Sequence, residues 1–232
     1  MIDKILKSEN TLNMYRFGSH VYGTNNKDSD EDYYVIQKTF TESESIDIHH
    51  VTVAQFEQLL LNQDIQALEC VFLPSKHILK ESVHFTHILD KVRLRKSIST
   101  VSDNSFVKGK KKLIVAADYD KKLALKSIFH SLRIRDIGTQ VALEGKIVDY
   151  AAMNWILKDL YKLGEELERE ELWNAIDTKY RSVYNNLRSQ FVELCPKDSK
   201  RQLKINKVVD ILKISKETLS LKTIKAIVDE IG

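Results

Sequence analysis

The spacing of apolar and polar residues changes once along the chain, from strand-like alternation to helical periodicity. Residues 1 to about 10 predict a short helix, and Met14–Phe17 predicts a strand. Two further strands are predicted over Asp32–Lys38 and Ser45–Val51. The polar connection Thr39–Glu44 has the length and composition of a hairpin loop. Together these segments predict a small mixed sheet.

Helical spacing begins at Thr52, which is a suitable N-cap, and the apolar positions keep this spacing until Pro74 closes the segment. The rest of the chain shows almost no strand alternation. It predicts long helices over residues 103–117, 119–143, 149–168 and 172–194. Gly145 favours the end of the second of these helices.

The last part of the sequence predicts a linker at residues 196–200 and two short amphipathic helices over 203–214 and 221–231. We therefore expect an α+β protein. Its parts are a small mixed-sheet domain over residues 1–100, an all-helical region over 101–196 and a helical extension over 200–232.

Composition agrees with a globular protein, since 43% of the 232 residues are hydrophobic and 30% are charged. Cys70 and Cys195 lie among apolar neighbours without metal-ligand spacing, which predicts buried thiols in a reducing compartment and no zinc site. The amino terminus lacks the apolar core of a signal peptide, and no apolar run has membrane-spanning length. We expect a cytoplasmic protein that does not contact a membrane.

The net charge of +3 permits nucleic-acid binding without requiring it. The distribution of charge is more informative than the total, because lysines concentrate in Lys108–Lys112 and Lys121–Lys126, with Arg133 and Arg135 following. These residues form either a contact surface for RNA or an ordinary solvated helix face.

Candidate chemistry concentrates in one stretch near the amino terminus. Gly18 and Ser19 form a turn whose backbone amides can approach a phosphate closely, because glycine has no Cβ. Asp30 and Asp32 lead into Tyr-Tyr-Val-Ile, so strand alternation places them on one face and Glu31 on the other. Carboxylates on one face suit a Mg²⁺ ion that also binds substrate phosphates. Taken separately, a Gly-Ser pair is a common turn, and an Asp pair can be an exposed strand start.

The order of these elements, hydrophobic-Gly-Ser and then Asp-x-Asp in a strand, resembles the DNA polymerase β-type nucleotidyltransferase superfamily. The longer form Gly-Ser-His-x-Tyr-Gly-Thr followed by Ser-Asp-x-Asp is similar to the branch of predicted nucleotidyltransferases associated with RNA repair. The resemblance implies a palm-like sheet, a short helix after Ser19, an NTP substrate and Mg²⁺ (or Mn²⁺). It also implies a third carboxylate on a neighbouring strand, for which Asp47 is the candidate. Alternatively, Asp47 belongs with Glu42 and Glu44 to a solvated acidic loop.

A second candidate element lies in the predicted helix 119–143. Lys126, His130 and Arg133 are spaced i, i+4 and i+7, which places three potential cations on one helical stripe. Apolar residues surround the stripe, so burying it is costly unless an anion such as a triphosphate lies against it. The RNA-repair branch is similar in carrying a Lys-x-x-x-His-x-x-Arg helix. The alternative is a helix surface with a partly buried histidine.

Some positions depart from that branch. Glu69 matches an acidic position in it, but Gln63-Asp64 stands where an Asn-Pro pair is usual, and a buried glutamate paired with Arg or His is the favoured interpretation. Glu31 replaces an apolar residue, and Tyr33-Tyr34 replaces an Arg-Gly pair that often follows. Substrate contacts near Tyr33 are therefore expected to differ.

The residues and the resemblance together predict a metal-dependent nucleotidyltransferase that transfers NMP from an NTP to an acceptor hydroxyl and releases pyrophosphate. The predicted catalytic and metal-binding residues are Asp30, Asp32 and Asp47. The predicted nucleotide-binding residues are Gly18, Ser19, Tyr22, Lys126, His130 and Arg133. The favoured acceptor is an RNA end, with tRNA among the candidates. The alternatives are a protein hydroxyl, as in AMPylating antitoxin members of the superfamily, and an inactive fold that only binds nucleotide or RNA.

Overall fold

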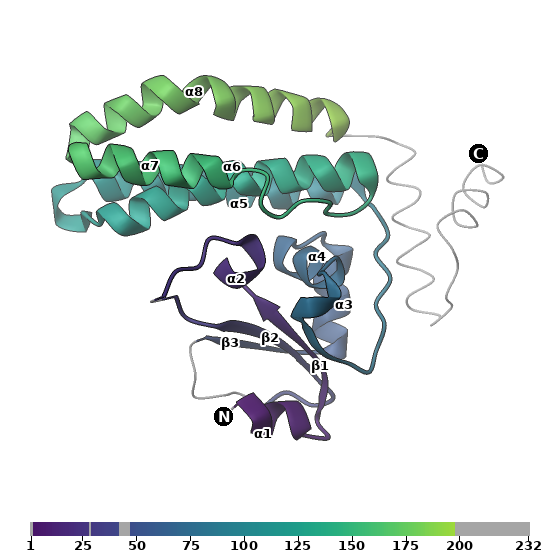
Figure 1. Cartoon of the computed structure of the whole chain (residues 1–232). Coiled ribbons are helices and arrows are strands. Elements are labelled where there is room, and N and C mark those ends of the chain that lie inside the picture. Colours follow the sequence, from purple (N-terminus) through teal and green to yellow (C-terminus); the bar gives the residue numbers. More distant parts are fainter. Residues whose placement is uncertain (1, 28, 42–46, 198–232) are drawn as a thin grey trace, which may run out of the picture.

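Four strands form one mixed sheet in the computed structural model, which describes residues 2–27, 29–41 and 47–197 (Figure 1). The strands are β1 (Thr11–Phe17), β2 (Asp32–Gln37), β3 (Ile48–Thr52) and β4 (Ile78–Glu81). Their order across the sheet is β3-β2-β1-β4. β1 pairs antiparallel with β2 and β4, whereas β2 and β3 run parallel. The predicted small mixed sheet is confirmed, with β4 as a short edge strand that the sequence did not predict.

The connection between β2 and β3 is not the predicted hairpin. Tyr33 lies beside Ile48 and Gln37 beside Thr52, so the two strands are parallel, whereas a hairpin loop joins antiparallel strands. Residue alternation fixes which face each side chain occupies, but it carries no information about strand direction. The parallel pairing brings the start of β3 next to the start of β2, which matters for the candidate site.

The two faces of the sheet pack against different helices. On one face, Met14, Tyr33 and Val35 pack with apolar residues of α1 (Ile2–Lys7). On the other, Tyr15, Tyr34 and Ile36 belong to the larger core that α3 (Val53–Leu61) and α4 (Ile65–Val71) complete. Figure 1 shows α1 on the side of the sheet opposite to α2 (Ser19–Tyr22), α3 and α4. The short helix after Gly18 is therefore present, as predicted.

The helical segment that follows Thr52 is broken into α3 (Val53–Leu61) and α4 (Ile65–Val71). Thr52 caps α3 as predicted, in a reciprocal capping box with Gln55. The break was not predicted. It occurs at Gln63, whose φ of 56° is held by hydrogen bonds to partners distant in sequence, including His87 and the backbone N–H of Asp90.

Four long helices form a layer over the α2–α4 side of the sheet (Figure 1). They are α5 (Lys91–Ile114), α6 (Lys121–Glu144), α7 (Asn154–Glu166) and α8 (Arg169–Leu194). Short 3₁₀ turns occupy Ser75–His77 and Ala116–Asp118. α6 ends at Glu144 and is capped by Gly145, whose φ is 71°, as the sequence predicts. The helical layer has its own core, to which Leu125, Phe129 and Trp173 contribute.

Several helix boundaries differ from the prediction: α7 begins at Asn154 rather than at residue 149, and α8 begins at Arg169 rather than at residue 172. α5 begins at Lys91, where the Asp90 side chain accepts hydrogen bonds from the first turn, rather than at residue 103. The domain boundary predicted at residue 100 therefore falls inside a continuous helix. The predicted linker end and the helices over 203–214 and 221–231, with the extension 200–232, lie outside the described residues.

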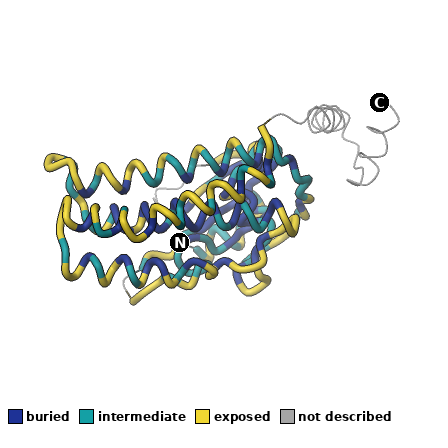
Figure 2. Tube along the Cα trace, turned by 90° about the horizontal axis from the view of Figure 1, so that it is seen from above, coloured by how far each residue is buried: buried dark blue, intermediate teal, exposed yellow. Residues whose placement is uncertain are grey.

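Buried and exposed residues alternate along the long helices when the molecule is seen from above (Figure 2).

Cys70 and Cys195 are free, buried thiols, as predicted. Within the described residues, no helix combines the length and the apolar character needed to cross a lipid bilayer.

Candidate functional site

Parallel pairing of β2 and β3 brings Asp47 beside Asp32. Tyr33 is the partner of Ile48, and its backbone N–H donates to the Asp47 carbonyl at 2.8 Å. Asp32 and Asp47 each stand one residue before this pair, at the same edge of the sheet. Asp32 also lies two residues before Tyr34, so its side chain is on the face that packs toward α3, α4 and the long helices.

The Gly18 backbone touches the Asp32 carboxylate from the other neighbouring strand. Phe17 pairs with Asp32, and a Cβ placed on Gly18 would lie 2.1 Å from Oδ2 of Asp32. Gly18 also has φ of 72°, a conformation that favours glycine. No other residue fits this position without displacing the carboxylate. The turn that begins α2 is therefore built directly against Asp32.

Partial burial and two neighbouring carboxylates shape the environment of Asp32. Burial, then the charges of Asp47 and Asp30, raise the pKa of its carboxyl group, while His20 and Lys126 act in the opposite direction. Asp30 and Asp47 are exposed. The structure thus brings the three predicted carboxylates into one electrostatic neighbourhood, and it brings Lys126 of α6 within range of the same group.

Glu31 lies apart from this neighbourhood, as strand alternation predicts. Its carboxylate is 3.3 Å from Arg16, and it accepts a hydrogen bond from the Tyr33 hydroxyl. Tyr33 belongs to the α1 face of the sheet, opposite to Asp32. The unusual Glu31 and Tyr33 therefore pair with each other and with Arg16.

Carboxylate oxygens such as those of Asp30, Asp32 and Asp47 are the ligands that a hard divalent cation prefers. These three side chains do not, however, form a complete coordination shell. Within the described residues, no three His, Cys, Asp or Glu side chains converge as a group that could hold a metal ion. Mg²⁺ needs only one or two carboxylates when substrate phosphates and water supply the other ligands. Mutually repelling carboxylates, one of them partly buried, fit that requirement, because a cation relieves the repulsion.

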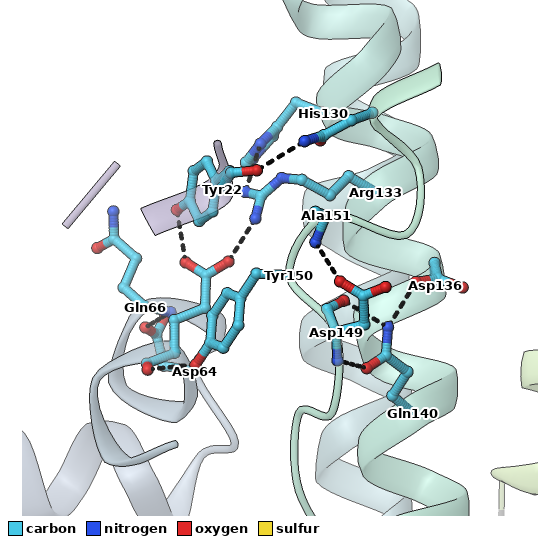
Figure 3. Close-up of polar contacts among 12 residues, drawn as sticks. Tyr22, Asp64, Gln66, His130, Arg133, Asp136, Gln140, Asp149, Tyr150 and Ala151 are labelled. Carbon is cyan, nitrogen blue, oxygen red and sulfur yellow. Dashed lines mark hydrogen bonds and ion pairs between the residues drawn. The ribbon is translucent and has the colours of Figure 1, made fainter. Parts of the chain in front are cut away.

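Arg133 and Glu69 form a buried ion pair that also involves Tyr22 (Figure 3). The Arg133 and Glu69 side chains are 2.7 Å apart and only 2% exposed each. Glu69 accepts a second hydrogen bond from the Tyr22 hydroxyl at 2.8 Å, and the Arg133 guanidinium lies 3.5 Å from the centre of the Tyr22 ring. The favoured interpretation of Glu69 agrees with this arrangement. The charge of Arg133 is already balanced within the protein.

His130 does not carry the positive charge that its place in the Lys126–His130–Arg133 stripe suggested. Its Nδ1 accepts a hydrogen bond from Arg133 at 3.1 Å, so this nitrogen carries no proton. Burial, followed by the charges of Arg133 and Lys108, lowers the pKa of His130 to about 3. His130 is therefore neutral at pH 7, and Lys126 is the exposed cation of the stripe.

Further contacts, which no sequence pattern indicates, join the Tyr22 segment and α4 to the long helices. Asn154, at the start of α7, donates to the Tyr22 carbonyl at 2.7 Å, and the Tyr150 hydroxyl donates to the Glu69 carbonyl at 2.8 Å. Gln140 holds the loop before α7 by accepting from the backbone N–H groups of Val148 and Asp149 (Figure 3). The partners of Asn154 and Tyr150 are far away in sequence, which is why helical periodicity alone could not find them.

The sequence has no match among known protein families or among curated proteins, and the structure has none among solved structures. The resemblance to nucleotidyltransferases therefore stays a prediction.

Proposed function

We propose that this protein is a metal-dependent nucleotidyltransferase that transfers NMP from an NTP to an acceptor hydroxyl. The observation that carries the proposal is the contact between Gly18 and Asp32, with Asp47 paired alongside. A glycine turn pressed against one member of an acidic cluster provides backbone donors for phosphate and oxygen ligands for a cation at the same place.

Asp30, Asp32 and Asp47 would hold Mg²⁺ (or Mn²⁺), which when bound supplies charge neutralisation for the triphosphate and a lower pKa for the acceptor hydroxyl. Gly18 and Ser19 would contact the β- and γ-phosphates. The acceptor oxygen bonds to the α-phosphorus and loses its proton to water, the bond from the α-phosphorus to the bridging oxygen breaks, and pyrophosphate leaves. Lys126, which is exposed and acts on the same electrostatic neighbourhood, would balance the charge of pyrophosphate.

Arg133 and Tyr22 have a different proposed role from Lys126. Because Arg133 is buried against Glu69 and Tyr22, it would act by holding α2, and with it the Gly18 turn, at a fixed distance from α6. Fixing this turn matters because small displacements of bound phosphates cost large factors in rate. His130, as a neutral imidazole, would be a hydrogen-bond donor through Nε2.

The proposed acceptor is an RNA end, with tRNA as one candidate. The support is the excess of lysine and arginine on α5 and α6, the helices that lie over the sheet. Phosphate-rich acceptors are favoured by such a surface through counterion release.

Labelled NTPs test the proposal. The purified full-length protein is incubated with each α-labelled NTP, Mg²⁺ or Mn²⁺ and bulk RNA, and the label is followed into RNA, into protein or into neither. We expect metal-dependent label in RNA, lost in the double variant Asp30→Ala/Asp32→Ala. Label in protein alone would replace RNA by a protein acceptor. Transfer that persists in the double variant would remove the proposed site, and no transfer under any condition would favour a binding module.

A further inference from the structure

One stripe of α5 changes from apolar to basic along the helix. Leu94, Val101 and Lys108 are spaced by seven residues, so they lie on nearly the same side of α5. Leu94 and Val101 both belong to the core that includes the sheet residues Tyr15 and Tyr34. Lys108 therefore projects from the side of α5 that faces the sheet part of the molecule, beyond the packed region.

α6 carries a matching stripe. Ile137 packs in the same core, and His130, Lys126 and Lys122 follow toward the start of the helix at spacings of seven, four and four residues. Lys122 and Lys126 are exposed. Both helices are thus apolar where they cover the sheet and basic where they approach the α5–α6 turn, which in Figure 1 projects beyond the sheet.

Gly109 brings the two stripes close together. A Cβ on Gly109 would lie 2.5 Å from Cγ1 of Ile128 and 3.0 Å from the Ala124 carbonyl oxygen, so the backbones of α5 and α6 nearly touch there. Lys108 precedes this contact, and its charge is one cause of the lowered pKa of His130 on α6. Lys108 of α5 therefore lies near the α6 stripe at His130, which is one turn from Lys126, and we treat the lysines of both helices as one surface.

The two helix segments that form this surface contain no acidic residues of their own. Residues 104–114 and 121–135 contain no Asp or Glu. Lys112 and Lys121 are paired with carboxylates from other segments, and Lys110 lies over the Trp173 ring, whereas Lys108 and Lys122 are exposed and have no carboxylate partner within the described part of the chain. Unpaired lysines clustered on helix segments without acidic residues are a local excess of positive potential.

We propose that Lys108 and Lys122 bind backbone phosphates of a single-stranded RNA whose terminal hydroxyl reaches the carboxylates at Asp32. The inference rests on the proposed function and assigns the surface that takes the acceptor. Lys126 connects the two regions, because it lies one turn from Lys122 and also acts on Asp32. Lysines one turn apart have Cβ atoms about 5–6 Å from each other, which suits successive phosphates of an extended strand.

RNA binding without catalysis tests this surface separately from the proposed function. Fluorescence anisotropy is measured in EDTA with a labelled 20-nucleotide single strand, for the wild type, for the double variant Lys108→Gln/Lys122→Gln, and for the control Lys4→Gln/Lys7→Gln. The control removes the same charge from exposed lysines of α1, on the opposite side of the sheet. We expect the first variant to bind about 10- to 100-fold more weakly near 0.1 M salt, with the slope of log K against log salt reduced by about 1.4. The control should bind like the wild type.

Equal affinity of the two double variants would overturn the proposal. So would a Lys108→Gln/Lys122→Gln variant that keeps its RNA affinity but needs more NTP for half-maximal transfer, since these lysines would then bind the nucleotide. If the expected loss of RNA binding is found but no nucleotidyl transfer occurs, the surface stands and the proposed function fails. Thermal melting of each variant shows whether it is folded, and the exposure of all four lysines makes an unchanged fold the expected result.

Discussion

Arg133 on α6 and Glu69 on α4 form an ion pair of 2.7 Å in which both side chains are almost completely buried. The pair joins the helical layer to the sheet part of the molecule, and Tyr22 adds the segment that follows Gly18 to the same cluster. Burial of both charges makes the pair costly to break from one side, because the remaining charge is left in a medium of low polarity.

Glu69→Gln should therefore destabilise the protein strongly. The change keeps the shape of the side chain but leaves the Arg133 charge buried and unbalanced, which costs about 3–5 kcal/mol. The free energy of unfolding in urea measures this effect. A control is Asp177→Asn, which breaks the Arg181–Asp177 pair on α8, where the side chains are 58% and 25% exposed. This control should cost less than about 1 kcal/mol. Equal losses in the two variants would show that burial of the Arg133–Glu69 pair is unimportant.

Gly18→Ala should reduce nucleotidyl transfer more strongly than the unfavourable positive φ of the new alanine would by itself. The new Cβ would overlap Oδ2 of Asp32, so either the turn or the carboxylate must move. We expect nucleotidyl transfer to fall by about 100-fold, the order of effect that misplacement by an ångström produces. Gly145→Ala is the matched control, since Gly145 has φ of 71° and nothing within 4 Å of its added Cβ. The control should lose about 1–2 kcal/mol of stability and keep its activity. Similar activities for the two variants would argue against a functional role of the contact between Gly18 and the Asp32 carboxylate.

Tyr22→Phe separates the two contacts of the Tyr22 side chain. The ring can still lie against Arg133, but one oxygen of Glu69 loses its donor, at a cost of about 1–3 kcal/mol. If Tyr22 fixes the turn before α2, kcat should fall while the metal concentration needed for activity stays unchanged. Tyr161→Phe, on the exposed side of α7, controls for loss of a hydroxyl. A Tyr22→Phe variant as active as this control would remove the positioning role.

The local features of the fold could be predicted from sequence, because each depends on residues a few positions apart. The Thr52 cap, the Gly145 end of α6 and the alternation that separates Asp32 from Glu31 are of this kind. Gln63 is different. Apolar spacing continues through the break between α3 and α4, and the side-chain contacts that hold the break come from residues 24 and 27 positions later in the chain.

The sequence allows candidate site residues to be proposed, but it does not show how these residues are arranged in the fold. The sequence places Lys126, His130 and Arg133 on one stripe, but it cannot show that Glu69, 64 positions earlier, faces Arg133. Without that partner, the stripe suggests three cations where the structure has a neutral histidine and an internally balanced arginine. Likewise, Asp47 lies beside Asp32 because β3 runs parallel to β2, a direction that alternation does not encode.

His87 should make stability fall in mild acid. Its Nε2 lies 2.8 Å from Oε1 of Gln63, and burial lowers the pKa of His87 to about 4. In the unfolded chain an ordinary histidine has a pKa of about 6.5. The unfolded state therefore binds more protons between these values, so the contribution of His87 is fully present above pH 6.5 and is lost as the pH falls toward 4.

The free energy of unfolding, measured at pH 7 and pH 5, tests this expectation. The slope from one such histidine approaches about 1.4 kcal/mol per pH unit, and His130, whose pKa is also lowered by burial, adds to it. His87→Gln should therefore reduce the total slope without abolishing it. His84→Gln is the control, because the His84 side chain is 84% exposed. An unchanged pH dependence in His87→Gln would show that this histidine is not the group responsible.

The position of the label within the nucleotide distinguishes nucleotidyl transfer from other reactions of an NTP. Each NTP, labelled at the α- or at the γ-phosphorus, is incubated with Mg²⁺, RNA and either the wild type, Asp32→Asn or Glu31→Gln. Glu31 is the matched control, since it is adjacent in sequence but paired with Arg16 on the other side of the strand. We expect the α-label to join the acceptor and the γ-label to leave as pyrophosphate in the wild type and in Glu31→Gln, but not in Asp32→Asn. Transfer of γ-label, or α-label transfer that survives in Asp32→Asn, would contradict it.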